Sequence, residues 1–361
     1  MTDSSKNELE RALHYPLADR LPPLGGAIEI RPGLKWLRMP MPFSLDHINL
    51  WLLRDCVEGR EGWALIDCCV DIPEARAAWE RIWAHELDGL PILRILVTHM
   101  HPDHVGLAHW LCQRWSVPGF DCRLWMSAAD YSSARHANEA VESEIGEDMA
   151  NHFASHGMTD PDALRQIRER RFYYRDLVPD VPHACARLMD GLDMPLGGNH
   201  WRCIAGYGHA PEHIALHDVA RGLLIAGDMV LPRISTHVGV YETEPEGDPL
   251  TLFLTSLERY RTLSADTLVL PAHGKPFTGL HTRLDQLHAH YQERLAGVLT
   301  AARTKPVSAW DILPLLFQRK LDQHQTIFAV AEVVAHLNHL WHAGQLTRAQ
   351  GGDGIWRYVA V

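Results

Sequence analysis

The stretch His-Met-His-Pro-Asp-His at residues 99–104 constrains the fold of this chain more than any other part of its sequence. It follows the aliphatic run Ile92 to Val97, which is typical of a buried strand, so the stretch begins on a loop at a strand end. Imidazole and carboxylate groups are ligands for divalent cations. His99 and His101 can point toward one cation, which leaves the aspartate and the last histidine for a second. The spacing therefore predicts a site for two metal ions.

Three further candidate ligands, His209, Asp228 and His273, also follow apolar runs. The runs are Trp201 to Ala205, Leu223 to Ala226 and Leu268 to Leu270. A chain with 24 histidines among 361 residues could cluster some of them by chance. Recurrence of the same arrangement at four predicted strand ends disfavours chance and favours one shared site.

These residues resemble the metallo-β-lactamase-fold hydrolases over nearly the whole chain. Within that family they look like the hydroxyacylglutathione hydrolase (glyoxalase II) and lactamase-β-like-2 branch. The resemblance implies an αββα sandwich, an α/β fold with the site at one edge of two packed sheets. Its implied ligand set is His99, His101 and His209 for one metal, Asp103, His104 and His273 for the other, and Asp228 as the bridge between them.

Two further residues are expected to support the ligands. The resemblance implies that Asp67 hydrogen-bonds a ligand imidazole and fixes its tautomer. The family usually has a small residue and then glycine after this aspartate, where this chain has Cys68 and Cys69. His213 could itself bind metal, but seven groups already fill a dinuclear site, so we expect a supporting or structural role for it.

The ligand set predicts hydrolysis. Two cations bridged by Asp228 lower the pKa of a bound water, so a metal-bridging hydroxide is the expected nucleophile. Asp103 is expected to orient that hydroxide and to shuttle its proton. Zinc suits an imidazole-rich site, and iron and manganese are alternatives. Arg233 and Tyr241, downstream of the bridging aspartate, are candidate substrate contacts.

The leading substrate prediction is a thioester or ester carbonyl, as in an acyl-glutathione, an acyl-CoA or a lactone. A formal net charge of −11 disfavours nucleic acid and anionic membrane surfaces as partners. The alternative enzyme is a metal-dependent endoribonuclease of the lactamase-β-like-2 type. A scaffold protein with a vestigial metal site is a third hypothesis, which the complete ligand set disfavours.

Two other branches of the family fit the residues less well. A resistance-type β-lactamase would carry a signal peptide, and its commonest class has cysteine in place of Asp228. A flavodiiron-type redox site would have glutamate in place of His101. The seven cysteines are scattered without a Cys-x-x-Cys pair, which indicates reduced thiols. We therefore expect a cytoplasmic enzyme without a membrane span, with a homo-oligomer as an open alternative.

The domain prediction is a catalytic domain at residues 1–303 and a winged-helix-like domain at residues 304–361. The second has two helical patterns followed by a strand, a glycine-rich turn and a strand, and its net charge of about +1 favours a structural role over phosphate binding. A helical insertion at residues 127–188 could form a lid. Its acidic half and its basic half are expected to pair, although Arg168, Arg171 and Arg175 could instead meet an anionic substrate. Other helices are expected at residues 73–85, 104–115 and 281–303.

Overall fold

Two β-sheets packed face to face form the centre of the computed structural model, which describes residues 8–139, 145–169 and 173–361. The first sheet has seven strands in sequence order, antiparallel from β1 to β4 and parallel from β4 to β7. Its strands are β1 (Gly26–Arg31), β2 (Leu34–Pro40), β3 (His47–Val57), β4 (Arg60–Ile66), β5 (Ile92–Leu96), β6 (Arg123–Ser127) and β7 (Cys185–Leu188).

The second sheet has five strands in the order β12-β11-β10-β9-β8. Only the β11–β12 pair is parallel among these described strands. The strands are β8 (Asp193–Leu196), β9 (Asn199–Gly206), β10 (His213–Asp218), β11 (Leu223–Gly227) and β12 (Leu268–Pro271).

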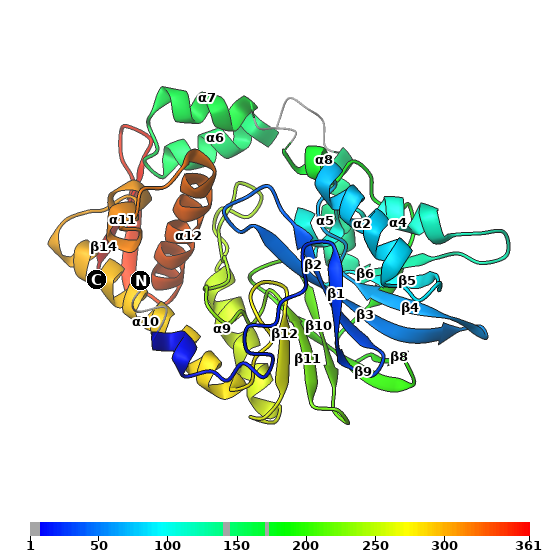
Figure 1. The fold of residues 1–361 in the computed structure, drawn as a ribbon. Helices are drawn as coiled ribbons and strands as arrows, with labels where there is room; N and C mark the ends of the chain where they lie inside the picture. The colour runs from blue at the N-terminus through cyan, green and yellow to red at the C-terminus, as the bar shows by residue number, and fades with distance from the viewer. Residues whose placement is uncertain (1–7, 140–144, 170–172) are drawn as a thin grey trace.

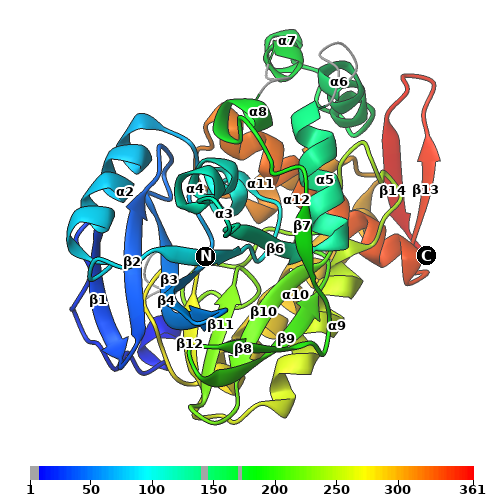
Figure 2. The same ribbon diagram turned by 90° about the vertical axis from the view of Figure 1, so that its right-hand side faces the viewer.

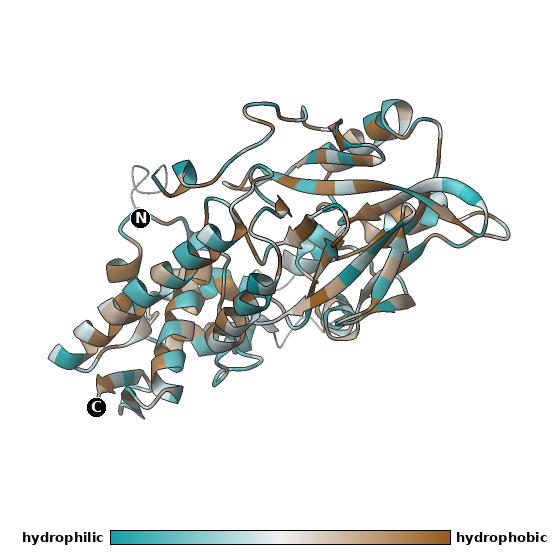
Figure 3. Ribbon diagram, turned by 90° about the horizontal axis from the view of Figure 1, so that it is seen from below, coloured by the Kyte–Doolittle hydropathy of each residue, from teal (hydrophilic) through white to brown (hydrophobic). Residues whose placement is uncertain are grey.

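Helices cover the outer face of each sheet (Figures 1 and 2). The first sheet is covered by α2 (Pro73–His85), α4 (Ala108–Trp115) and α5 (Ala128–Glu139), and the second by α9 (Pro249–Arg259) and α10 (Leu280–Thr304). Large apolar side chains such as Trp36, Trp51 and Trp201 fill the space between the sheets. Hydrophobic and hydrophilic residues alternate along the elements (Figure 3), as expected where one face of each is buried. The predicted αββα sandwich is confirmed.

The C-terminal region forms a small unit whose core also includes side chains of α10 and of residues 150–167. It contains α11 (Ala309–Leu316) and α12 (Gln323–His342), each begun by a capping box, and the hairpin β13 (Leu346–Gln350) and β14 (Trp356–Ala360). This order agrees with the predicted pattern, while the winged-helix description stays a prediction. None of the described helices combines the length and the apolar composition needed to cross a bilayer.

The predicted insertion is wrong at its end, because residues 185–188 form β7 and pair with β6 in the first sheet. The helices before it are α5, α6 (Ile145–Ser155), α7 (Pro161–Glu169) and α8 (Tyr173–Leu177). Helices α6 and α7 pack against the C-terminal unit (Figure 1), where the backbone N–H of Trp310 donates to the carbonyl of His156 at 3.1 Å. Arg168 pairs with Glu147 at 2.7 Å, which agrees with pairing between the two halves; Arg171 lies outside the described residues. The lid role stays a prediction.

The helix predicted at residues 104–115 is divided in two. Helix α3 (Pro102–Val105) ends before Gly106, and α4 begins at Ala108. Leu107 leaves the helical conformation at ψ 6°, and its N–H donates to the carbonyl of Cys69 at 3.0 Å. A Cβ on Gly106 would come within 2.8 Å of that same carbonyl oxygen, so only glycine allows this close approach.

Candidate metal centre

Four loops at strand ends bring the predicted ligands together. His99, His101, Asp103 and His104 follow β5 of the first sheet, while His209, Asp228 and His273 follow β9, β11 and β12 of the second. Because these strand ends meet at one edge of the sandwich, residues more than 100 positions apart in the sequence become neighbours. All seven predicted ligands lie in this cluster.

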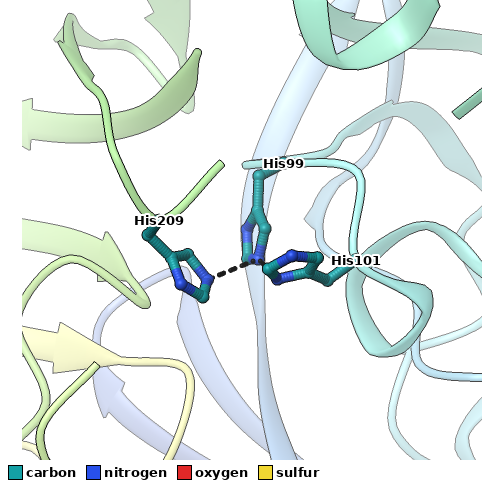
Figure 4. Close-up of side chains that lie close together, drawn as sticks. All are labelled: His99, His101 and His209. Atoms are coloured by element: carbon teal, nitrogen blue, oxygen red, sulfur yellow. Dashed lines mark hydrogen bonds between the residues drawn. The ribbon is translucent and has the colours of Figure 1, made fainter. Parts of the chain in front are cut away.

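One group of the cluster consists of His99, His101 and His209 (Figure 4). The Nε2 atom of His99 lies 2.9 Å from Nδ1 of His101 and 3.1 Å from Nε2 of His209. Burial lowers the pKa of His101 to about 3 and that of His99 well below its usual value. Both rings are therefore neutral at physiological pH, which is the form that binds metal ions.

The other group consists of Asp103, His104 and His273. Oδ2 of Asp103 lies 3.3 Å from Nε2 of His273 and 3.6 Å from Nε2 of His104. Burial lowers the pKa of His104, but the carboxylates of Asp67, Asp103 and Asp228 outweigh it and raise that pKa to about 10. The buried carboxylates thus strongly favour a positive charge at the position of His104.

Asp228 lies between the two groups. Its Oδ2 is 3.5 Å from Nε2 of His209, whereas its Oδ1 is 3.5 Å from Nε2 of His273 and 3.6 Å from Nε2 of His104. Burial raises the pKa of this carboxyl, but the surrounding histidines outweigh that effect and hold it well below its usual value. One oxygen of an ionised carboxylate therefore faces each group.

The cluster fits divalent cations. Nε2 of His104 and Oδ1 of Asp228 are buried, and among the described residues neither has a hydrogen-bond partner. An unpartnered buried polar atom is costly, and a metal ion would satisfy both of them. Imidazole nitrogens with carboxylate oxygens form a donor set suited to zinc, iron or manganese.

Residues 44–273 match the family described as "Metallo-beta-lactamase superfamily", and residues 295–361 match the "Metallo-beta-lactamase-like, C-terminal domain". The chain belongs to the metallo-beta-lactamase superfamily. This membership, together with the His/Asp cluster, makes it a metallo-hydrolase. The glyoxalase II and lactamase-β-like-2 branch stays a prediction.

Members of the superfamily with similar chains include two of known structure. A beta-lactamase domain protein from Burkholderia ambifaria is 52% identical, with a TM-score of 0.92 over 98% of this chain and 100% of that one. The metallo-beta-lactamase family protein TTHA1429 from Thermus thermophilus is 31% identical, with a TM-score of 0.74 over 92% of this chain and 100% of that one. The "Probable metallo-hydrolase YqjP" of Bacillus subtilis is 24% identical over 330 residues, 89% of this chain and 96% of that protein.

Three of the histidines have their outward ring nitrogen held by a neighbour. Nδ1 of His104 donates to Asp67 at 2.9 Å, as the superfamily resemblance implied. Nδ1 of His209 donates to the carbonyl of His237 at 2.7 Å, and Nδ1 of His273 donates to the carbonyl of His47 at 2.9 Å. These bonds hold a proton on each Nδ1 and turn each Nε2 toward the cluster, where a metal ion could bind it. The sequence analysis did not identify the carbonyls of His47 and His237 as partners. Every residue has a backbone carbonyl, so the residue type gives no signal of this role.

His213 lies behind Asp228. Its Nε2 accepts a hydrogen bond from the backbone N–H of Asp228 at 3.2 Å, so the ring supports the loop. Gly227 has φ +50°, and a Cβ there would lie 2.2 Å from that nitrogen. Only glycine allows this close approach.

Asp130 of α5 is a supporting residue that the sequence analysis missed. Its carboxylate accepts from the N–H of Met100 at 2.7 Å and from the N–H of Glu212 at 2.5 Å. Burial raises its pKa to about 6. The Ser-x-x-Asp spacing from Ser127 signals a helix start, yet it gives no sign that the side chain connects two ligand loops.

The two predicted substrate contacts lie in different places. Arg233 lines a pocket of about 610 Å³ that also includes His273. Tyr241 is not among the residues that line this pocket; its hydroxyl bonds to the ring of His237 at 2.9 Å and its ring packs near Phe153 of α6. Arg233 therefore shares a pocket with one residue of the cluster, His273.

Proposed function

We propose that this chain hydrolyses the carbonyl of a thioester or ester, of the acyl-glutathione, acyl-CoA or lactone type, with two divalent ions, most suitably zinc. The observation that carries the dinuclear proposal is the position of Asp228, whose two oxygens face different groups of histidines. His99, His101 and His209 would hold one ion, and Asp103, His104 and His273 the other.

Cations held in these positions supply Lewis acidity and an activated water as nucleophile. The protein positions the reactants around them. Burial raises the pKa of Asp103, but the rings of His104 and His273 outweigh it and lower that pKa to about 2, so the carboxylate is ionised. It can therefore accept a hydrogen bond from the attacking water and orient it toward the substrate carbonyl. Asp67 and the carbonyls of His47 and His237 hold the ligand rings in place.

A small substrate is supported by the pocket and by the charge. A volume of about 610 Å³ lies within the range usual for small-molecule sites, and His273 is part of its wall. The formal net charge of −11 repels a polyanion such as RNA. Both features favour a small acyl compound over a nucleic acid.

The test compares three substrates on the metal-loaded protein: an acyl-glutathione or acyl-CoA thioester, a homoserine-type lactone, and single-stranded RNA. We expect cleavage of the thioester or the lactone, lost on chelation and restored by metal. Cleavage of RNA alone would contradict the proposal and would support the endoribonuclease alternative.

A further inference from the structure

The pocket beside His273 is basic, although the chain as a whole is acidic. Four of its side chains are cationic: Arg11, Arg38, Arg233 and Lys275. Among the described residues that line it, Glu10 alone is acidic. This local excess of positive charge contrasts with a formal net charge of −11 for the chain. A cavity lined by charge of one sign concentrates ligands of the opposite sign.

Two of these cations form ion pairs in which a ligand could replace the acidic partner. Lys275 pairs with Asp19 at 3.0 Å, but the side chain of Asp19 is fully exposed. Arg38 lies 3.7 Å from Asp46, whose side chain is 73% exposed. Pairs with such solvent-exposed carboxylates contribute little energy, so an incoming anion can replace them.

Arg233 lies near Glu10, whose side chain is less exposed than those of Asp19 and Asp46, at 29%. Its Nε atom lies 3.8 Å from Oε2 of Glu10, which is longer than a hydrogen bond, and its side chain is 48% exposed. Arg233 lines the pocket, and its guanidinium has the planar geometry that forms paired hydrogen bonds with a carboxylate or phosphate.

The N-terminal segment provides a fixed wall for this pocket. Leu13 is buried in the core under the second sheet, and the backbone of His14 pairs with that of Thr278. Lys275 donates to the carbonyl of Ala18 at 3.1 Å. The wall is therefore part of the folded structure on the side where His273 joins the cluster.

We propose that this pocket binds the anionic tail of the substrate while the scissile carbonyl lies at the metal cluster. The substrate class is then a thioester whose thiol part carries carboxylate or phosphate groups. This inference rests on the proposed function, and it adds Arg11, Arg38 and Lys275 to Arg233 as recognition residues. Charge complementarity and the shared wall at His273 carry it.

The kinetic experiment uses three thioesters with the same acyl group, joined to glutathione, to coenzyme A and to the neutral thiol N-acetylcysteamine. The first carries carboxylates and the second phosphates, so the pair separates the two sources of negative charge. We expect kcat/KM to be about tenfold or more higher for at least one anionic thioester than for the neutral one, mainly through KM. Added salt should reduce that preference.

The variant Arg233→Gln/Lys275→Gln removes two of the pocket cations. We expect it to reduce the anionic-to-neutral ratio of kcat/KM about tenfold. The control is Arg123→Gln, because Arg123 lies on β6, is 69% exposed and does not line the pocket. The control should leave the ratio unchanged.

A binding measurement separates this inference from the proposed function. Calorimetric titration of the metal-free protein with glutathione, and separately with coenzyme A, should detect binding of at least one, weakened in the double variant and retained in the control. Binding without turnover of any thioester would refute the proposed function but support an anion pocket. Equal kcat/KM for anionic and neutral thioesters, with no binding of either thiol, would refute the pocket inference alone.

Discussion

Asp67 shows how a single residue can serve both backbone and site. It follows β4 with φ +63°, a conformation that costs a non-glycine residue about 1 to 2 kcal/mol. Its carboxylate accepts from the N–H of Thr98 at 2.8 Å and from Nδ1 of His104 at 2.9 Å. Cys69, where the family usually has glycine, also has a positive φ of +76°. The hydrogen bonds hold Asp67 in a conformation that points it at a ligand ring.

The substitution Asp67→Asn should weaken metal binding about 10- to 100-fold, because the tautomer of His104 would no longer be fixed by a carboxylate. Asparagine tolerates the left-handed conformation, so the fold should be retained. Competition between the protein and a chelator of known affinity measures the effect. The control is Asp71→Asn, which removes only a pair with Arg76; equal metal affinity in both variants would contradict the role of Asp67.

Helix α12 connects the C-terminal unit to the metal centre. Its buried Glu332 pairs with Arg294 of α10 at 3.0 Å and lies 3.8 Å from the ring of His237. The carbonyl of His237 in turn accepts from Nδ1 of His209. A helix more than 100 residues away in the sequence therefore supports the loop that presents one of the candidate ligands.

The substitution Glu332→Gln should destabilise the metal-free protein by about 3 kcal/mol at neutral pH, since it leaves the Arg294 cation without its buried partner. Burial raises the pKa of Glu332, but the nearby ring of His237 and the charge of Arg294 outweigh it and lower that pKa to about 2. Because folding lowers this pKa, the ionised carboxylate stabilises the fold fully at pH values above its ordinary pKa of 4.5. This contribution is lost as the pH falls toward 2.

Urea unfolding of the metal-free wild type and the Glu332→Gln variant at several pH values measures this difference. It should shrink between pH 4.5 and the lowest pH at which both proteins stay folded. Glu293→Gln, on the exposed side of α10, should show no comparable difference at any pH. A wild-type advantage that is independent of pH would contradict the assignment.

At the scale of the whole molecule, the candidate metal centre joins the two sheets. Four of the seven candidate ligands follow β5 of the first sheet, and three follow strands of the second. The sheets also share a core of apolar side chains, so the fold does not depend on metal alone. Bound ions would add a second connection at the edge of the sandwich.

Metal removal should therefore lower the melting temperature without unfolding the protein at room temperature. Ions present at about 100 times their dissociation constant stabilise the folded state by about 2.7 kcal/mol for each site. Thermal unfolding with added zinc, and again with excess chelator, measures the shift. Asp228→Ala should bind less metal, lose turnover and show a smaller shift; equal melting temperatures of the wild type with and without metal would contradict a metal that joins the sheets.

Local patterns in the sequence were sufficient to identify the residues of the candidate cluster and most elements. Each candidate loop was recognisable as a polar residue directly after an aliphatic run, because a buried strand must be apolar up to its end. Helix α2 begins at Pro73 and ends at His85 as predicted, since proline at the first turn and apolar spacing are both local signals. The order of helices and strands in the C-terminal region was likewise recognisable.

Only the tertiary structure decided the features that depend on distant partners. The four residues of β7 are too few for a periodic pattern and become a strand by pairing with β6. The break before α4 exists because the N–H of Leu107 finds the carbonyl of Cys69. His273 is held by the carbonyl of His47, which is 226 residues away. The basic pocket combines the N-terminal segment with residues from 38–47, 233–234 and 273–275. Backbone carbonyls and cavity walls belong to no residue type, so their positions follow only from how the chain packs.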